Sequence, residues 1–81
     1  MDYKVEYINR DKKIIVPANS ITKLRRILIQ QYIGPMDKAK VYNDKGQLKG
    51  VIMRGYSDIL WRTPKDKLYV LFKDGSFRGE Y

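Results

Sequence analysis

The sequence predicts an α+β domain in which a single helix packs on a curled, mainly antiparallel sheet, in the order ββα followed by a β meander. Apolar residues recur at helical spacing over one segment only, residues 19–33. The segments on either side alternate apolar and polar residues and are interrupted by turn residues at short intervals, which is typical of antiparallel strands. A chain of 81 residues has room for one small core, so we expect residues 1–81 to form one domain.

The first sixteen residues predict a β-hairpin. In residues 3–7, tyrosine and valine alternate with Lys4 and Glu6, which indicates a half-buried strand. Residues 9–11 have turn chemistry, and residues 12–16 predict a second strand. Pro17 ends that strand, because proline has no amide proton for the ladder.

The predicted helix runs from Asn19 to Ile33. Asn19 or Ser20 can cap its start with a side-chain oxygen, and Gly34-Pro35 ends it because proline cannot continue the hydrogen-bond ladder. The apolar stripe that should face the sheet consists of Ile21, Leu24, Ile27, Leu28 and Tyr32. This stripe predicts that the helix is the centre of the only core.

Turn signals divide the rest of the chain into short strands. The strands are predicted at residues 40–42, 48–54, 59–62, 68–72 and 76–81. Gly50 predicts a bulge in the second of these. Residues 68–72 are apolar on both faces, so either the sheet curls on itself, which we favour, or a partner covers one face. Residues 41–50 and 71–79 also share a pattern, which we attribute to a common hairpin turn rather than to duplication.

Short matches along most of the chain point to one known fold. They are Pro17, Ser20 and Ile21 at the helix start, Gly34, Pro35 and Asp37 after it, Val41, Tyr42 and Gly46–Leu48 in the following strand pair, and Ser57-Asp58 with Leu68–Leu71 further on. In this order the chain resembles the ubiquitin-like β-grasp. The resemblance implies a mixed sheet whose last strand lies parallel to the first, and a role in protein interaction. Asp74-Gly75 favours a C-terminal hairpin instead, and both alternatives stay open.

Composition argues against catalysis. The chain has no cysteine and no histidine, which removes the thiol nucleophile, the commonest general base and the commonest metal ligands. The nine acidic residues are scattered singly, so neither a carboxylate pair nor an oxygen-ligated metal site is predicted. The glycines form no phosphate-binding loop. We therefore expect no enzyme, no cofactor, no metal and no small-molecule substrate.

The charge balance indicates an anionic partner. Lysine and arginine number 17 against nine acidic residues, a formal charge of +8. Such a charge attracts nucleic acid or an acidic protein, although it also serves solubility. No apolar run can span a bilayer and no signal-peptide pattern opens the chain, so we expect a cytoplasmic protein without a membrane role. The sequence does not indicate an oligomeric state.

Basic residues next to aromatic ones suggest a nucleic-acid interface, since such proteins track phosphates with cations and stack bases on rings. The residues predicted to contact phosphates are Lys23, Arg25, Arg26, Lys40, Arg54 and Arg62, and those predicted to stack are Tyr42 and Trp61. Strand alternation around a small core explains the same pattern without a ligand.

A protein-binding alternative uses the helix. On an ideal helical wheel, Ile29 and Ile33 fall away from the main stripe and lie beside Arg26, which would suit a docking spot for an adaptor or inhibitor. A wider stripe with the sheet wrapped around it explains the two isoleucines equally simply.

Overall fold

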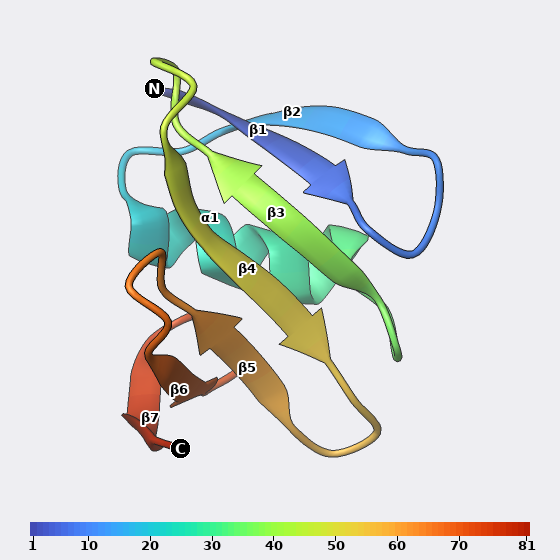
Figure 1. Cartoon of the computed structure of the whole chain (residues 1–81), viewed down its shortest axis with the longest axis vertical. Helices are drawn as coiled ribbons and strands as arrows, with labels where there is room; N and C mark the ends of the chain where they lie inside the picture. The colour runs from blue at the N-terminus through green and yellow to red at the C-terminus, as the bar shows by residue number, and fades with distance from the viewer.

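The computed structural model describes all 81 residues and shows one helical segment against a seven-stranded antiparallel sheet (Figure 1). The predicted α+β class is confirmed. In chain order the elements are β1 (Asp2–Tyr7), β2 (Lys13–Pro17), α1 (Ile21–Ile27), η1 (Leu28–Tyr32), β3 (Lys38–Tyr42), β4 (Leu48–Arg54), β5 (Ile59–Arg62), β6 (Leu68–Leu71) and β7 (Phe77–Glu80). The strands lie in the order β2-β1-β3-β4-β5-β6-β7, and every neighbouring pair is antiparallel.

The sheet curls around the helix. In Figure 1, β3 and β4 cross in front of α1, whereas β6 and β7 turn back beneath it. The turn between β6 and β7 lies directly against α1, because a Cβ on Gly75 would overlap the carbonyl oxygen of Thr22 and lie 2.6 Å from the amide nitrogen of Arg26. The curl expected from the doubly apolar strand is therefore present.

The mixed-sheet alternative is wrong for the strand pairing. β1 lies between β2 and β3, and β7 pairs only with β6, so the first and last strands do not meet. The reason is local. Gly75 adopts a φ of +88°, and this left-handed residue turns the chain back as a hairpin. β7 consequently becomes an edge strand.

Three hairpins of the meander use the same turn. In each, the amide of the first residue bonds to the carbonyl four residues on, and the amide of the fourth residue bonds back to the first carbonyl. The turns are Asn43–Gly46, Thr63–Asp66 and Phe72–Gly75, and the fourth residue has a φ between +68° and +88° in all three. The Thr63–Asp66 turn lies outside the repeated sequence pattern and still has the same hydrogen bonds, so shared turn chemistry accounts for that pattern.

The helix begins as predicted but continues differently. The Ser20 hydroxyl accepts the Lys23 amide at 3.2 Å, which caps α1. From Leu28 the segment is a π-helix, closed by an Ile33 amide that bonds to the Leu28 carbonyl at 2.6 Å. Because a π turn holds more residues than an α turn, the following side chains rotate relative to an ideal wheel. Ile33 turns into the core and Tyr32, predicted to be buried, is 38% exposed.

The core lies between the helix and the concave face of the sheet. It is a single cluster of 14 buried residues, and the larger side chains that are fully enclosed are Leu24, Leu28, Ile33, Ile52, Val5 and Val41. Alternation places Tyr3, Val5 and Tyr7 of β1 in this core, so the intervening residues point away from the helix. The convex side of the sheet is left without a covering element.

Candidate functional site

The face of the sheet turned away from the helix is the most basic continuous surface that the strand register defines. We call it the outer face. It carries cations from four strands, namely Lys4, Lys13, Lys38, Lys40 and Arg62. Between them lie half-buried Tyr42, Val51, Met53 and Leu60. The face therefore combines positive charge with apolar area, which scattered surface lysines do not.

The register brings these side chains into rows across the strands. Lys4 lies opposite Tyr42, and its Nζ is 5.9 Å from the centre of the tyrosine ring. Lys40 lies opposite Val51, and Val51 lies opposite Arg62. Cross-strand neighbours on one face have side chains within contact range. Tyr42 is thus placed among cations from β1 and β3.

Acidic side chains reduce this charge only locally. Glu6 lies opposite both Lys13 and Lys40. Arg62 donates to the Asp66 carboxylate at 2.7 Å, but both side chains are largely exposed, so the pair is weak. The outer face keeps a net positive charge.

The predicted contact residues divide into three groups. Lys40, Tyr42 and Arg62 lie together on the outer face. Lys23 and Arg26 are exposed, but they lie on the helix, which packs against the opposite face of the sheet. The structure therefore does not bring these two together with the first group.

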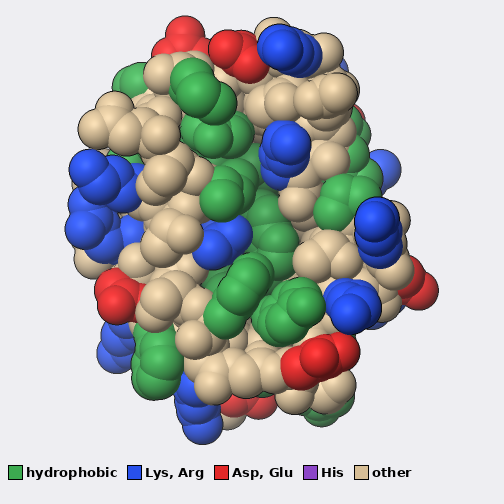
Figure 2. All heavy atoms as spheres, turned by 90° about the vertical axis from the view of Figure 1, so that its left-hand side faces the viewer, with side chains coloured by type: hydrophobic (Ala, Val, Ile, Leu, Met, Phe, Trp, Pro, Cys, Tyr) green, Lys and Arg blue, Asp and Glu red, His purple; other side chains and the backbone are tan.

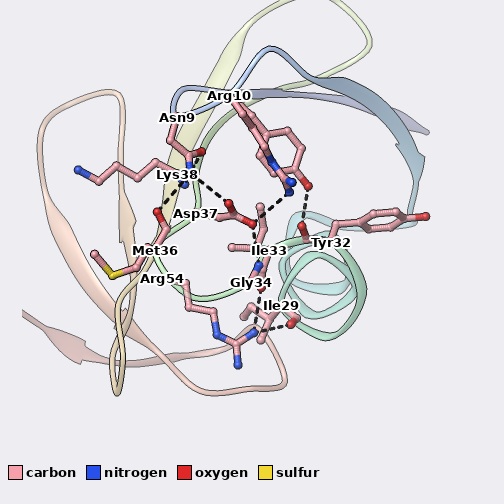
Figure 3. Close-up of polar contacts among 11 residues, drawn as sticks. Asn9, Arg10, Ile29, Tyr32, Ile33, Gly34, Met36, Asp37, Lys38 and Arg54 are labelled. Carbon is pink, nitrogen blue, oxygen red and sulfur yellow. Dashed lines mark hydrogen bonds and ion pairs between the residues drawn. The ribbon is translucent and has the colours of Figure 1, made fainter.

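The remaining predicted contacts are structural. Arg54 donates to the carbonyls of Ile29 and Ile33 at 2.8 and 2.9 Å, as Figure 3 shows. These carbonyls belong to the helix end, where orphan acceptors and the negative end of the helix dipole favour a cation. The guanidinium group of Arg54 is therefore committed to holding the helix on β4.

Trp61 is only 2% exposed and cannot stack on a base. Its indole ring packs against Gly50, where any Cβ would overlap the ring. The ladder between β3 and β4 shifts register beside Gly50, as that glycine predicted. The tryptophan that looked like a stacking platform is thus a core residue that requires a glycine beneath it.

Arg25 is also buried, with 4% of its surface exposed. Its guanidinium carbon lies 4.9 Å from the Trp61 ring centre and 4.6 Å from that of Phe77, so two aromatic rings enclose the cation. It is the single charged member of the helix row that also holds Ile21, Ile29 and Ile33 at i, i+4 spacing. That spacing was the sequence signal that Arg25 belongs to the buried side.

The docking spot predicted on the helix is wrong. Ile29 is 4% exposed and Ile33 is 1% exposed, so neither can meet a partner beside Arg26. The wider stripe, with the sheet wrapped around it, is the arrangement observed. The π turn contributes, because it rotates Ile33 toward the sheet.

A polar cluster that the sequence did not predict joins the helix end to the β1–β2 hairpin (Figure 3). The Asp37 carboxylate accepts the Gly34 amide at 2.9 Å, the Asn9 amide group at 3.1 Å and Arg10 at 3.2 Å. Burial alone would raise the pKa of Asp37, but these hydrogen bonds and the nearby positive charges outweigh it and lower the pKa. The cluster fixes loops rather than presenting a reactive group.

No three acidic side chains gather into a possible metal-binding group. No helix in the structure has the length and apolar character that a membrane crossing requires.

No protein-family model matches the chain, and no curated protein and no solved structure matches it either.

Proposed function

We propose that the protein is a non-catalytic module that binds single-stranded nucleic acid on the outer face of its sheet. The observation that carries the proposal is the register, which gathers cations from four strands on the face that no helix covers and places Lys4 and Lys40 next to Tyr42. Single strands are bound by tracking phosphates with Lys and Arg and by stacking bases on aromatic side chains. The outer face offers both elements within one surface.

The chemistry of the proposed contact follows from the rows of side chains. Tyr42 offers a ring for one base, and Lys4 and Lys40 on neighbouring positions would meet the phosphates on either side. Val51 and Met53 are half-buried, so a base laid over them would remove apolar surface from water. No base-specific donor or acceptor stands out, so we expect little sequence preference.

The test is a salt titration of binding to a fluorescent single-stranded oligonucleotide of about ten nucleotides, followed by anisotropy. With about five cations engaged, log affinity should fall against log salt with a slope of about −3 to −4. A flat line, or no binding at low salt, would reject the proposal. The unfolding midpoint of each variant would be measured in parallel to establish that it is folded.

A pair of matched variants locates the surface. Lys40→Gln removes a charge from the outer face and should weaken binding while making the salt slope shallower by about one. Lys23→Gln removes the same charge from the helix and should change neither quantity. Tyr42→Ala should cost about 1–3 kcal/mol of binding free energy if a base stacks there. Equal effects of Lys40→Gln and Lys23→Gln would show that only net charge matters.

A protein partner is the second candidate, because the register also forms an apolar row on this face. Met53 lies opposite Leu60, which lies opposite Val70, and all three side chains are half-buried. An apolar contact of this kind keeps its affinity at high salt, unlike binding to nucleic acid. Binding that survives high salt and is lost in Met53→Asp would identify this adaptor-like function instead.

A further inference from the structure

Arg25 is a buried charge that has no acidic partner. The ion pairs of the structure are Arg10 with Asp37 and Arg62 with Asp66, and neither involves Arg25. Buried cations in proteins are normally paired, because loss of hydration is expensive when no opposite charge compensates it. Burial accordingly lowers the pKa of Arg25. The protein itself therefore supplies no opposite charge to this guanidinium group.

The guanidinium group is held rigidly in place. Its Nε donates to the Gly75 carbonyl at 2.8 Å and its Nη2 donates to the Thr22 hydroxyl at 3.2 Å. The rings of Trp61 and Phe77 enclose it, and the Phe77 ring stacks on Tyr69 at 4.5 Å. These contacts come from α1, β5, β6 and the β6–β7 hairpin, so the curl of the sheet positions the group.

One end of the guanidinium group remains free. Nη1 donates to no protein acceptor, although a guanidinium carries more N–H donors than Arg25 uses. Every fully buried side-chain polar atom of the protein has a partner, so Nη1 must keep contact with solvent. Arg25 reaches the surface in a cleft of about 320 Å³. We infer that the free donors face this cleft, because Arg25 lines it and Nη1 is not fully buried.

The walls of the cleft are mostly apolar. The other residues that line it are Met1, Tyr3, Ile21, Trp61, Asn43 and Lys49. Figure 2 views the molecule from the side on which the helix begins and shows hydrophobic side chains gathered along a central furrow, with basic groups within and beside it. No acidic residue contributes to the cleft, and its volume is at the lower end of the range for small-molecule sites.

We propose that this cleft binds a small organic anion, a carboxylate or phosphate group on an apolar body, with Arg25 Nη1 and Lys49 holding the charged end. The apolar body would lie against Met1 and Ile21, the apolar lining residues that are not buried. Arginine suits such a position because its guanidinium is more weakly hydrated than an ammonium and recognises both oxyanions. The cleft opens beside the helix on the concave side of the sheet, so this site is independent of the outer face.

The native protein supplies its own reporter. Trp61 is the single tryptophan, lines the cleft and lies 4.9 Å from the Arg25 guanidinium carbon, so its fluorescence should respond to a bound anion. The probes are hexanoate, hexyl phosphate, hexanol as the neutral counterpart, and sodium chloride at matched ionic strength. We expect at least one anion to bind ten-fold or more tightly than hexanol. The stronger of the two identifies the head group.

Two outcomes of that titration would overturn the proposal: anions that bind no better than hexanol, and a chloride response equal to that of the anions. Chain length gives an internal check, because each methylene that becomes buried should add up to about four-fold in affinity, and acetate should therefore bind more weakly than hexanoate.

Variants test the charged end without disturbing the core. Arg25 holds the β6–β7 turn, so its replacement risks unfolding the protein, whereas Lys49 is exposed. Lys49→Gln should weaken anion binding about five-fold or more, and the matched control Lys13→Gln on β2 should leave it unchanged. In the unaltered protein, the side-chain NMR signals of Arg25 should shift on binding. Equal affinities in the two variants, or unshifted Arg25 signals at saturation, would refute the assignment.

Discussion

Gly75→Ala tests whether the sheet closes on the helix. Gly75 has a φ of +88°, and an added Cβ would overlap the Thr22 carbonyl oxygen and lie 2.6 Å from the Arg26 amide nitrogen. Both are backbone atoms of α1 and cannot rotate away. Gly46 occupies the same place in the β3–β4 turn, with a φ of +77° and open space around it. The two alanine variants share the backbone penalty and differ only in contact with the helix.

The expected magnitudes follow from these two differences. A left-handed conformation costs a residue with a side chain about 1–2 kcal/mol, which is the loss of stability expected for Gly46→Ala. Overpacking against fixed atoms adds about 1–3 kcal/mol, so Gly75→Ala should lose about 2–5 kcal/mol. The substitution would also displace the Gly75 carbonyl, which accepts Arg25 Nε at 2.8 Å.

Urea denaturation of the wild type and the two variants measures the free energies directly. A difference of at least about 1 kcal/mol between the variants, or about 4–8 °C in the unfolding midpoint, is expected in a domain of this size. Equal losses would show that the turn does not touch the helix in solution. The curled sheet, and with it the position of Arg25, would then be refuted.

Three further predictions concern the core and the helix end. Leu28→Ala should lower the free energy of unfolding by about 2–5 kcal/mol because Leu28 is fully buried, whereas Tyr32→Ala should lower it less. A larger loss for Tyr32→Ala in urea denaturation would show that Tyr32 is a core residue, as an ideal helix predicts. Ile29→Glu should abolish the cooperative unfolding transition, since it places an unpaired charge in the core. If circular dichroism shows that the variant is folded, Ile29 is not a core residue. The lowered pKa of Asp37 means that its carboxylate stabilises the fold fully above its unfolded pKa of 3.8, and that this contribution is lost as pH falls through the lower folded pKa. The thermal unfolding midpoint of Asp37→Asn should therefore be lower than that of the wild type at neutral pH, and it should fall less steeply below about pH 4. Parallel plots of midpoint against pH for the two proteins would contradict this.

Local patterns were sufficient to predict most of the fold. Alternation located β1 and β2, turn chemistry located the hairpins, and a strand apolar on both faces indicated that the sheet must curl. The strands and turns follow from interactions between residues close in the sequence. The curl follows because a single helix can cover only one face of a sheet. The sequence could not show how far the curl goes, because that depends on contacts such as Gly75 against α1, which join residues about fifty positions apart.

The helix shows where periodicity fails. An ideal wheel placed Tyr32 inside and Ile33 outside, and a π turn that starts at Leu28 reverses both positions. Such a turn adds a single residue to one turn of the helix, and the spacing of apolar residues in the sequence does not indicate where it occurs. The wheel was correct for Leu24 and Leu28, but it failed for Arg25, which is buried although it lies before the π turn, as well as for Tyr32 and Ile33.

Aromatic residues were the least predictable part of the candidate site. Tyr42 and Trp61 both follow the same rule of a ring next to a cation, yet Tyr42 lies on the outer face and Trp61 in the core. Alternation places Tyr42 on the outer side of β3 and Trp61 on the inner side of β5, and the missing side chain of Gly50 makes room for the indole there. That glycine lies on another strand, so only the register between β4 and β5 reveals the relation.

Each arginine contributes the same positive charge as each lysine, but the two residue types differ in the contacts that they make. Arg10, Arg25, Arg54 and Arg62 each donate guanidinium hydrogen bonds to protein acceptors, whereas no lysine ammonium group does. The planar guanidinium presents several donors in a fixed fork, which suits helix ends and carboxylates, while an ammonium on a flexible stem remains hydrated. In a small basic domain of this kind, the charge that is free to meet a polyanion is therefore mainly that of its lysines. Arg25 differs from the other arginines in being buried, and its Nη1 still has no protein acceptor.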